Sequence, residues 1–134
     1  IHAALLARDG RPDEALRLFR MACRLDLDNL TGTTAWGLHL ATFGGVWQAL
    51  VLGFAGVRPR GAGLVVDPHI PTTWGELRIR LQHRGRRLEV RASPTTLHLT
   101  SDAPIEVTVP GAGTAEVASE GLQWTRISDG WRLP

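Results

Sequence analysis

The sequence contains no lysine and a single cysteine, Cys23, among its 134 residues. All fifteen basic residues are arginine, a bias that genome composition explains more readily than a function does. One cysteine excludes a disulfide within the chain, and neither a CxxC pair nor a spacing typical of zinc ligands is present. We therefore expect no bound metal ion and a reducing, cytoplasmic setting.

We also expect no secretory leader, because the first residues show no basic segment followed by an apolar core and a small-residue cleavage site. A run of 28 residues without formal charge, 30–57, is long enough to raise a membrane span as an alternative. Six glycines, His39 and several threonines dilute this run, which favours a helix buried on most sides. We expect no membrane partner.

Charge is distributed unevenly, although the net value is only +2. Residues 58–91 carry eight arginines against three acids, whereas residues 92–134 carry two against five. Such a basic segment raises nucleic-acid binding as an alternative function. No interleaved aromatic residues and no groove-reading helix accompany its main cluster, so the solvated face of a hairpin is the better explanation for Arg78, Arg80, Arg84, Arg86 and Arg87. We expect no nucleic-acid partner.

The N-terminal part has the pattern of two helices. Residues 1–7 open in mid-pattern without a cap, which predicts the end of a helix that began before this sequence. Pro12 fits the first turn of a second helix, with Asp13 and Glu14 at its positive N-terminal end. The expected apolar face of this helix consists of Ala15, Leu18, Phe19, Ala22 and Cys23. The turn residues of DLDNLTG then end it.

A third helix is predicted over residues 33–54, with Thr33 or Thr34 as its N-cap. Its apolar residues point in almost every direction, and each of its four glycines costs about 1 kcal/mol relative to alanine. Close helix packing or approach to a ligand is the usual reason for such glycines. Three helices of this length cannot surround it, so we expect it to belong to the inner layer of a larger helical assembly.

After Val57 the apolar pattern changes to period two, which is typical of strands. Residues 63–71 and 77–81 are strand candidates, and HRGRR supplies a glycine turn before a partner strand over 88–92. Four further short strands are predicted over residues 96–100, 105–109, 115–118 and 122–127. The second half therefore predicts a small antiparallel sheet or sandwich, and the whole chain an α+β fold.

His39 is the one titratable side chain in the third predicted helix. A histidine on an apolar helix is more often a hydrogen-bonded core residue than a ligand or a catalyst. Gly37 and the pair at positions 44 and 45 remove side-chain bulk beside it, however, and a helix N-terminus suits an anion such as phosphate. Of the tryptophans, Trp36 and Trp47 are expected to pack in a core, and Trp74 to seat the β part on the helices.

Two stretches of the sequence closely resemble the C-terminal part of glycoside hydrolase family 65. The first is a helix containing GLHLA, GGVW and GFAG, and the second contains PHIPTTW and a hairpin with RG. The shared features run from Leu25 to Ala92. The resemblance implies that residues 1–57 are the last helices of an (α/α)6 catalytic barrel and that residues 58–134 form a C-terminal β-domain.

The family contains phosphorylases of maltose, trehalose and kojibiose, and also some trehalose hydrolases. In its phosphorylases a glutamic acid protonates the glycosidic oxygen while phosphate attacks the anomeric carbon, which inverts configuration and gives β-glucose 1-phosphate. Because phosphate replaces water, no second carboxylate base is needed. The family histidine that helps to hold phosphate corresponds to His39, with Thr33 and Thr34 as neighbours. Inorganic phosphate is then a co-substrate, and no cofactor is implied.

The family's acid is not in this chain, because none of the glutamates at positions 14, 76, 89, 106, 116 and 120 lies in its motif. We therefore expect no catalytic residue here and no catalysis by this chain without the missing N-terminal part of the same enzyme. Trp36 stands where family members often have an acid, which leaves the disaccharide open. Phosphorolysis is favoured over hydrolysis because His39 is retained. The alternatives are a hydrolase of the same family and a non-catalytic α+β interaction module, and a homodimer is left open.

Overall fold

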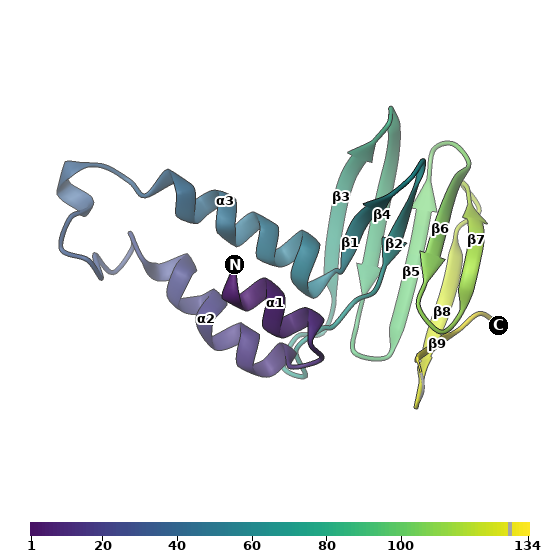
Figure 1. Ribbon diagram of the computed structural model, residues 1–134, viewed down its shortest axis with the longest axis horizontal. Coiled ribbons are helices and arrows are strands. Elements are labelled where there is room, and N and C mark those ends of the chain that lie inside the picture. The colour runs from purple at the N-terminus through teal and green to yellow at the C-terminus, as the bar shows by residue number, and fades with distance from the viewer. Residues whose placement is uncertain (129) are drawn as a thin grey trace.

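The computed structural model describes residues 1–128 and 130–134 and has an α+β fold, with helices projecting from one side of two packed sheets (Figure 1). The helical elements are α1 (His2–Arg8), α2 (Pro12–Arg24), the 3-10 turn η1 (Thr34–Trp36), α3 (Leu40–Gln48) and the π-helical turn η2 (Ala49–Phe54). The segment that joins α2 to α3 lies at the end of the helical part farthest from the strands (Figure 1). None of the helices is long and apolar enough to cross a membrane, within the residues that the structure describes.

The first two predicted helices are confirmed. Pro12 occupies the first turn of α2, and Asp13 and Glu14 lie in the same turn, where their charge complements the positive end of the helix. The predicted apolar face is rotated by about one residue, because Leu16 is buried together with Ala15. Leu18, which was expected on that face, is exposed.

The predicted continuous helix over 33–54 is wrong at its start. The chain makes only the turn η1, breaks at Gly37 with φ of 140°, and begins α3 at Leu40. His39 is therefore the N-cap residue of α3 rather than an interior residue, and neither Thr33 nor Thr34 caps that helix. The break has a physical cause, because the backbone N–H of His39 donates to a side chain instead of to a carbonyl one turn earlier.

Nine strands form two sheets in the described part of the chain. The four-stranded sheet has the order β1 (Val57–Arg60), β2 (Gly63–Val66), β6 (Ile105–Val109) and β7 (Gly113–Val117). The five-stranded sheet has the order β3 (Leu77–His83), β4 (Arg86–Ala92), β5 (Thr96–Ser101), β8 (Leu122–Ile127) and β9 (Gly130–Arg132). All pairs are antiparallel except β2 with β6, which are parallel. The sequence patterns did not predict β1, β9 or this parallel pair.

The predicted glycine turn joins β3 to β4 through two residues, Arg84 and Gly85. Both have positive φ, 50° and 80°, which is the conformation of a type I′ turn that matches the twist of a hairpin. The register pairs Leu77 with Ala92 and His83 with Arg86. Side chains on this hairpin consequently alternate between the core and an arginine-rich outer face, as the period-two pattern predicted.

The helices are attached to the sheets by an aromatic cluster. Trp74 lies 4.9 Å from the ring of Phe54 and 6.0 Å from that of Phe19, measured between ring centroids. Trp74 therefore packs between helices and strands, as expected. A second close contact joins η2 to α1 at Gly53, where a Cβ atom would lie 2.7 Å from the Cα of Ala4. Close helix packing thus explains this glycine.

Several arginines of the β3–β4 outer face form ion pairs with neighbouring glutamates. Glu89 accepts hydrogen bonds from Arg78 at 2.7 Å and from Arg80 at 2.9 Å. Arg91 makes two bonds of 3.1 Å with Glu76. Acids on neighbouring positions therefore compensate part of the positive charge, which is the arrangement of a solvated hairpin face.

We expect Glu89→Gln to lower the stability of the chain at neutral pH. The two arginines lower the pKa of Glu89 from 4.5 to about 2, so its ionised form stabilises the fold fully above pH 4.5. This contribution decreases as the pH falls through the range from 4.5 to about 2, where Glu89 takes up a proton. Urea unfolding at several pH values should show the difference between the variant and the parent shrinking over that range. Glu120→Gln, at an exposed position, serves as the control; an equal effect from it would contradict the prediction.

Candidate functional site

The three predicted site residues come together in the α2–α3 connection. Thr33 and Thr34 begin the turn η1, and His39 ends the segment that follows it. The Oγ1 atom of Thr33 lies 3.3 Å from Nε2 of His39 and 2.7 Å from Oγ1 of Thr31. The backbone N–H of Thr34 donates to the side chain of Asn29 at 3.1 Å, which ties the turn to the end of the preceding segment.

Asp26 holds His39 at two points. One carboxylate oxygen accepts the backbone N–H of His39 at 2.9 Å, and the other lies 2.5 Å from Nδ1 of the ring. The side chain of Asp26 is only 7% exposed, whereas that of His39 is 34% exposed. The carboxylate is therefore largely covered, whereas part of the imidazole remains accessible to a ligand.

The electrostatics of this pair fix which atoms carry protons. Hydrogen bonding from His39 is the main cause that lowers the pKa of Asp26 below its ordinary value. Asp26 is therefore a carboxylate at neutral pH, which can only accept, so Nδ1 must be the protonated partner. The Nε2 atom is then the one free to contact a ligand, beside the Thr33 hydroxyl. An ionised imidazolium and a hydroxyl together can donate hydrogen bonds to an oxyanion.

Thr34 adds a buried hydroxyl to this segment. Its Oγ1 atom has no hydrogen-bond partner of ordinary geometry among the described residues, but its side chain is one of the groups that lower the pKa of Asp26. The Thr34 hydroxyl therefore interacts with the Asp26 carboxylate.

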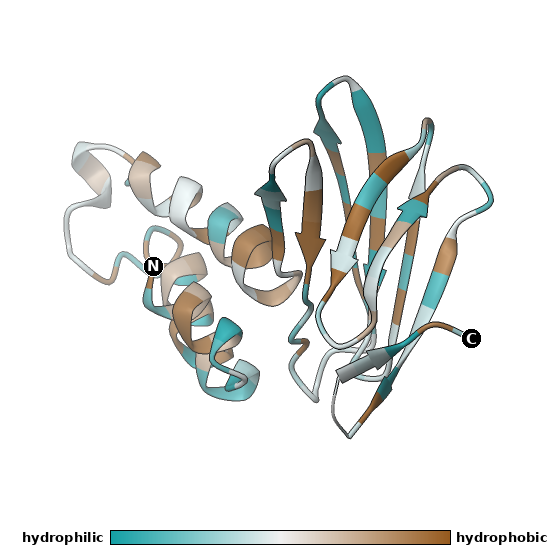
Figure 2. Cartoon of the chain, turned by 45° about the vertical axis from the view of Figure 1, so that its right-hand side comes forward, coloured by the Kyte–Doolittle hydropathy of each residue, from teal (hydrophilic) through white to brown (hydrophobic). Residues whose placement is uncertain are grey.

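The helix that follows His39 is apolar and largely uncovered. Large side chains exposed on it, on η1 and on the short segment between them are Trp36, Leu38, Leu40, Phe43 and Trp47. Figure 2 shows these hydrophobic segments on the part of the molecule that projects from the sheets. The expectation that Trp36 and Trp47 lie in a core is therefore not met within this chain. Gly44 and Gly45 also face open space, since a Cβ atom would meet nothing within 4 Å.

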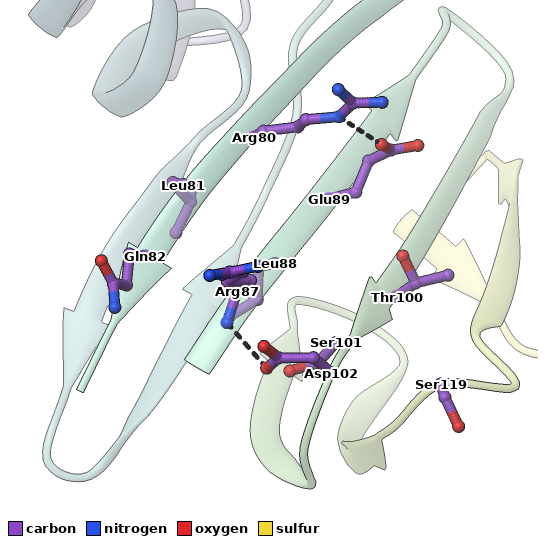
Figure 3. A pocket seen from close by; sticks show the side chains of 10 residues that line it. All are labelled: Arg80, Leu81, Gln82, Arg87, Leu88, Glu89, Thr100, Ser101, Asp102 and Ser119. Carbon is purple, nitrogen blue, oxygen red and sulfur yellow. Dashed lines mark hydrogen bonds and ion pairs between the residues drawn. The ribbon is translucent and has the colours of Figure 1, made fainter. Parts of the chain in front are cut away.

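A groove of about 640 Å³ on the outer side of β3, β4 and β5 is a separate candidate (Figure 3). Its most prominent charged side chains already have partners: Arg80 donates to Glu89, and Asp102 accepts the backbone N–H of Arg87. Polar groups that already have hydrogen-bond partners within the chain do not require a ligand to satisfy them. In the described part of the chain, no group of three or more His, Cys, Asp or Glu side chains is arranged to hold a metal ion.

Asp26 was missed by sequence reasoning. It lies in the DLDNLTG stretch, which was interpreted only as a helix stop, and thirteen residues separate it from His39. No local periodicity links the two positions. The signal that could have found it is chemical: an acid that precedes a helix break in the same segment as a lone histidine.

Comparison with known proteins supports one family. Residues 57–113 match the family model described as "Glycosyl hydrolase family 65, C-terminal domain". The alpha,alpha-trehalose phosphorylase of Geobacillus stearothermophilus is 42% identical over 90 residues, and the maltose phosphorylase of Bacillus subtilis is 38% identical over 90 residues. Each alignment covers 67% of this chain but only 12% of the relative.

A solved structure has the same fold. It is a putative kojibiose phosphorylase from the human microbiome, with a TM-score of 0.83 and 23% sequence identity. The match covers 93% of this chain and 17% of that chain. The chain thus spans about an eighth of the curated relatives' length and about a sixth of this structural neighbour.

Proposed function

Because the chain belongs to glycoside hydrolase family 65, we propose that it is the C-terminal portion of an enzyme that cleaves α-glucosidic disaccharides with inorganic phosphate. The reaction is an inverting phosphorolysis that releases β-glucose 1-phosphate. Trehalose, maltose and kojibiose are the candidate substrates, since phosphorylases of these sugars are similar in sequence to this chain. The observation that carries the proposal is His39, whose partly exposed side chain is held by Asp26 with Nε2 beside the Thr33 hydroxyl.

In this reaction His39 and the threonine hydroxyls contribute to the phosphate side of the site. The imidazolium of His39 donates from Nε2 to a phosphate oxygen, and the hydroxyl of Thr33 or Thr34 donates to another. These bonds orient the nucleophilic oxygen toward the anomeric carbon. The general acid that protonates the leaving sugar comes from the part of the enzyme outside this chain.

The helices of residues 1–57 are, in this proposal, the last helices of an (α/α)6 barrel, and residues 58–134 are its C-terminal β-domain. Support comes from α3, whose apolar side chains and two glycines face open space in this chain. The remaining barrel helices would cover these side chains, and one of them could pack closely against α3 at Gly44 and Gly45, where no side chain stands in the way. An exposed apolar face of this kind marks a surface that other protein segments cover, and in this proposal those segments are the rest of the barrel.

The reaction class is tested by assaying the intact enzyme with each of the three disaccharides, with and without inorganic phosphate. Phosphorolysis requires that glucose 1-phosphate appear and that cleavage stop when phosphate is withheld. Cleavage that proceeds at the same rate without phosphate would contradict the proposal and favour a hydrolase of the same family.

We expect His39→Ala to raise the KM of the intact enzyme for phosphate by about 10- to 100-fold, because a hydrogen bond between charged groups contributes about 1.5–3 kcal/mol. The KM for the disaccharide should change much less. His98→Ala, on β5 of the five-stranded sheet, is the matched control and should leave both constants unchanged. If His39 has only a structural role, its replacement should instead lower the thermal stability and leave the KM for phosphate unchanged.

A further inference from the structure

We propose that Asp26 is the positioning residue that presents His39 to phosphate, and that it does so by fixing both the position and the tautomer of the imidazole ring. This inference rests on the proposed function. It assigns a role to a residue outside the GLHLA stretch, in a segment whose sequence indicates only a helix stop.

The attachment is made at two points on one residue. Asp26 accepts the main-chain N–H of His39 with one oxygen and the side-chain Nδ1 with the other. A bond to the backbone alone would set the helix start, and a bond to the ring alone would leave the backbone free to move. Together they fix the position of the ring relative to the N-terminus of α3, which begins at the next residue.

The proton on Nδ1 follows from the carboxylate, which has no hydrogen to donate. A neutral His39 is therefore held as the Nδ1–H tautomer, and its Nε2 atom accepts from the Thr33 hydroxyl 3.3 Å away. When Nε2 also takes up a proton, the ring becomes a donor on its accessible side. Only this charged form can donate to a phosphate oxygen while it keeps its bond to Asp26.

Asp26 is also the acidic side chain that contacts the ring. The other charged groups close in sequence, Arg24 and Asp28, form a pair with each other at 2.5 Å. The elements α3 and η2, residues 40–54, carry no titratable side chain. Asp26 is thus the carboxylate in direct contact with the imidazolium, and it is mostly buried, where solvent screens the interaction less.

The first test is an ¹⁵N spectrum of the histidine side chains in the 134-residue chain, at a pH where the rings are neutral. The parent should show His39 as the Nδ1–H tautomer. In Asp26→Asn the side chain can also donate to the ring, so His39 should shift toward the Nε2–H tautomer. Asp28→Asn, which removes the same charge two residues away, should leave the His39 signals unchanged. An unchanged His39 tautomer in Asp26→Asn would overturn the inference without involving phosphate.

The second test measures the kinetics of the intact enzyme. Asp26→Asn should raise the KM for phosphate about 10-fold or more, with a smaller change in kcat at saturating phosphate, while Asp28→Asn should resemble the parent. The rise should be present across the pH range in which the parent binds phosphate best. Thermal unfolding of the same variants, and of Asp26→Ala, identifies any loss of folded protein and corrects the rates for it.

The outcomes separate the inference from the function on which it rests. If His39→Ala raises the KM for phosphate and Asp26→Asn does not, Asp26 has no positioning role, and the proposed function stands. If neither variant changes the phosphate dependence, the phosphate role of His39 fails first, and the role of Asp26 fails with it. A tautomer shift together with a selective rise in the KM for phosphate supports the inference.

Discussion

Replacing Gly56 by alanine is expected to destabilise the chain by about 3 kcal/mol or more, at or above the upper end of the usual range for a single substitution. Gly56 has φ of 63°, and a Cβ atom there would lie against the backbone carbonyl group of Asp67. The left-handed conformation costs a non-glycine residue about 1–2 kcal/mol. The clash adds to this cost because both partners are backbone, and it can be relieved only by moving the junction between η2 and β1. Urea unfolding of the chain measures the change.

The matched control is Gly61→Ala. Gly61 has nearly the same conformation, φ of 59°, but a Cβ atom there meets nothing within 4 Å. Gly61→Ala should therefore lower the stability only by the cost of the left-handed conformation, about 1–2 kcal/mol. If the two variants lose the same stability, the close approach at Gly56 makes no contribution, and the prediction is wrong.

Trp124→Ala is expected to destabilise the chain by about 3–5 kcal/mol, the range for deleting a large aromatic side chain from a core. Trp124 lies on β8 opposite Leu97 of β5 and is 1% exposed. Its removal leaves a cavity between the two sheets that the neighbouring strands cannot close without losing their pairing.

Trp36→Ala is the control for this variant, because it deletes the same side chain from a position that is 90% exposed. We expect a change within about 0.5 kcal/mol in the chain. Equal losses from Trp124→Ala and Trp36→Ala in thermal or urea unfolding would contradict the assignment of the core to the two sheets.

Much of the fold could be predicted because it depends on local pattern. Pro12 and the acids that follow it indicate a helix start, and alternation over residues 77–81 and 88–92 indicates a hairpin. These signals act over a few residues and need no knowledge of the rest of the chain. The glycine turn at Gly85 is of the same kind, since positive φ in a two-residue loop strongly favours glycine.

What could not be predicted depends on contacts between distant residues. The break before α3 arises where Asp26 accepts the backbone N–H of His39, and no periodicity in residues 33–54 records that bond. The same limit explains why Asp26 was missed. The exposure of Trp36 has another origin, because an apolar pattern shows that a residue needs a partner but not whether that partner belongs to the same chain.

The parallel pairing of β2 with β6 has a consequence for the order in which the chain can fold. Leu64 pairs with Val107, so the four-stranded sheet joins segments that are separated by the whole β3–β4–β5 meander. The meander consists of neighbouring hairpins and can close early, whereas β1 and β2 must wait for β6 to arrive. During synthesis on the ribosome, the hairpin of β1 and β2 therefore keeps one edge without a partner until the chain beyond residue 105 has emerged.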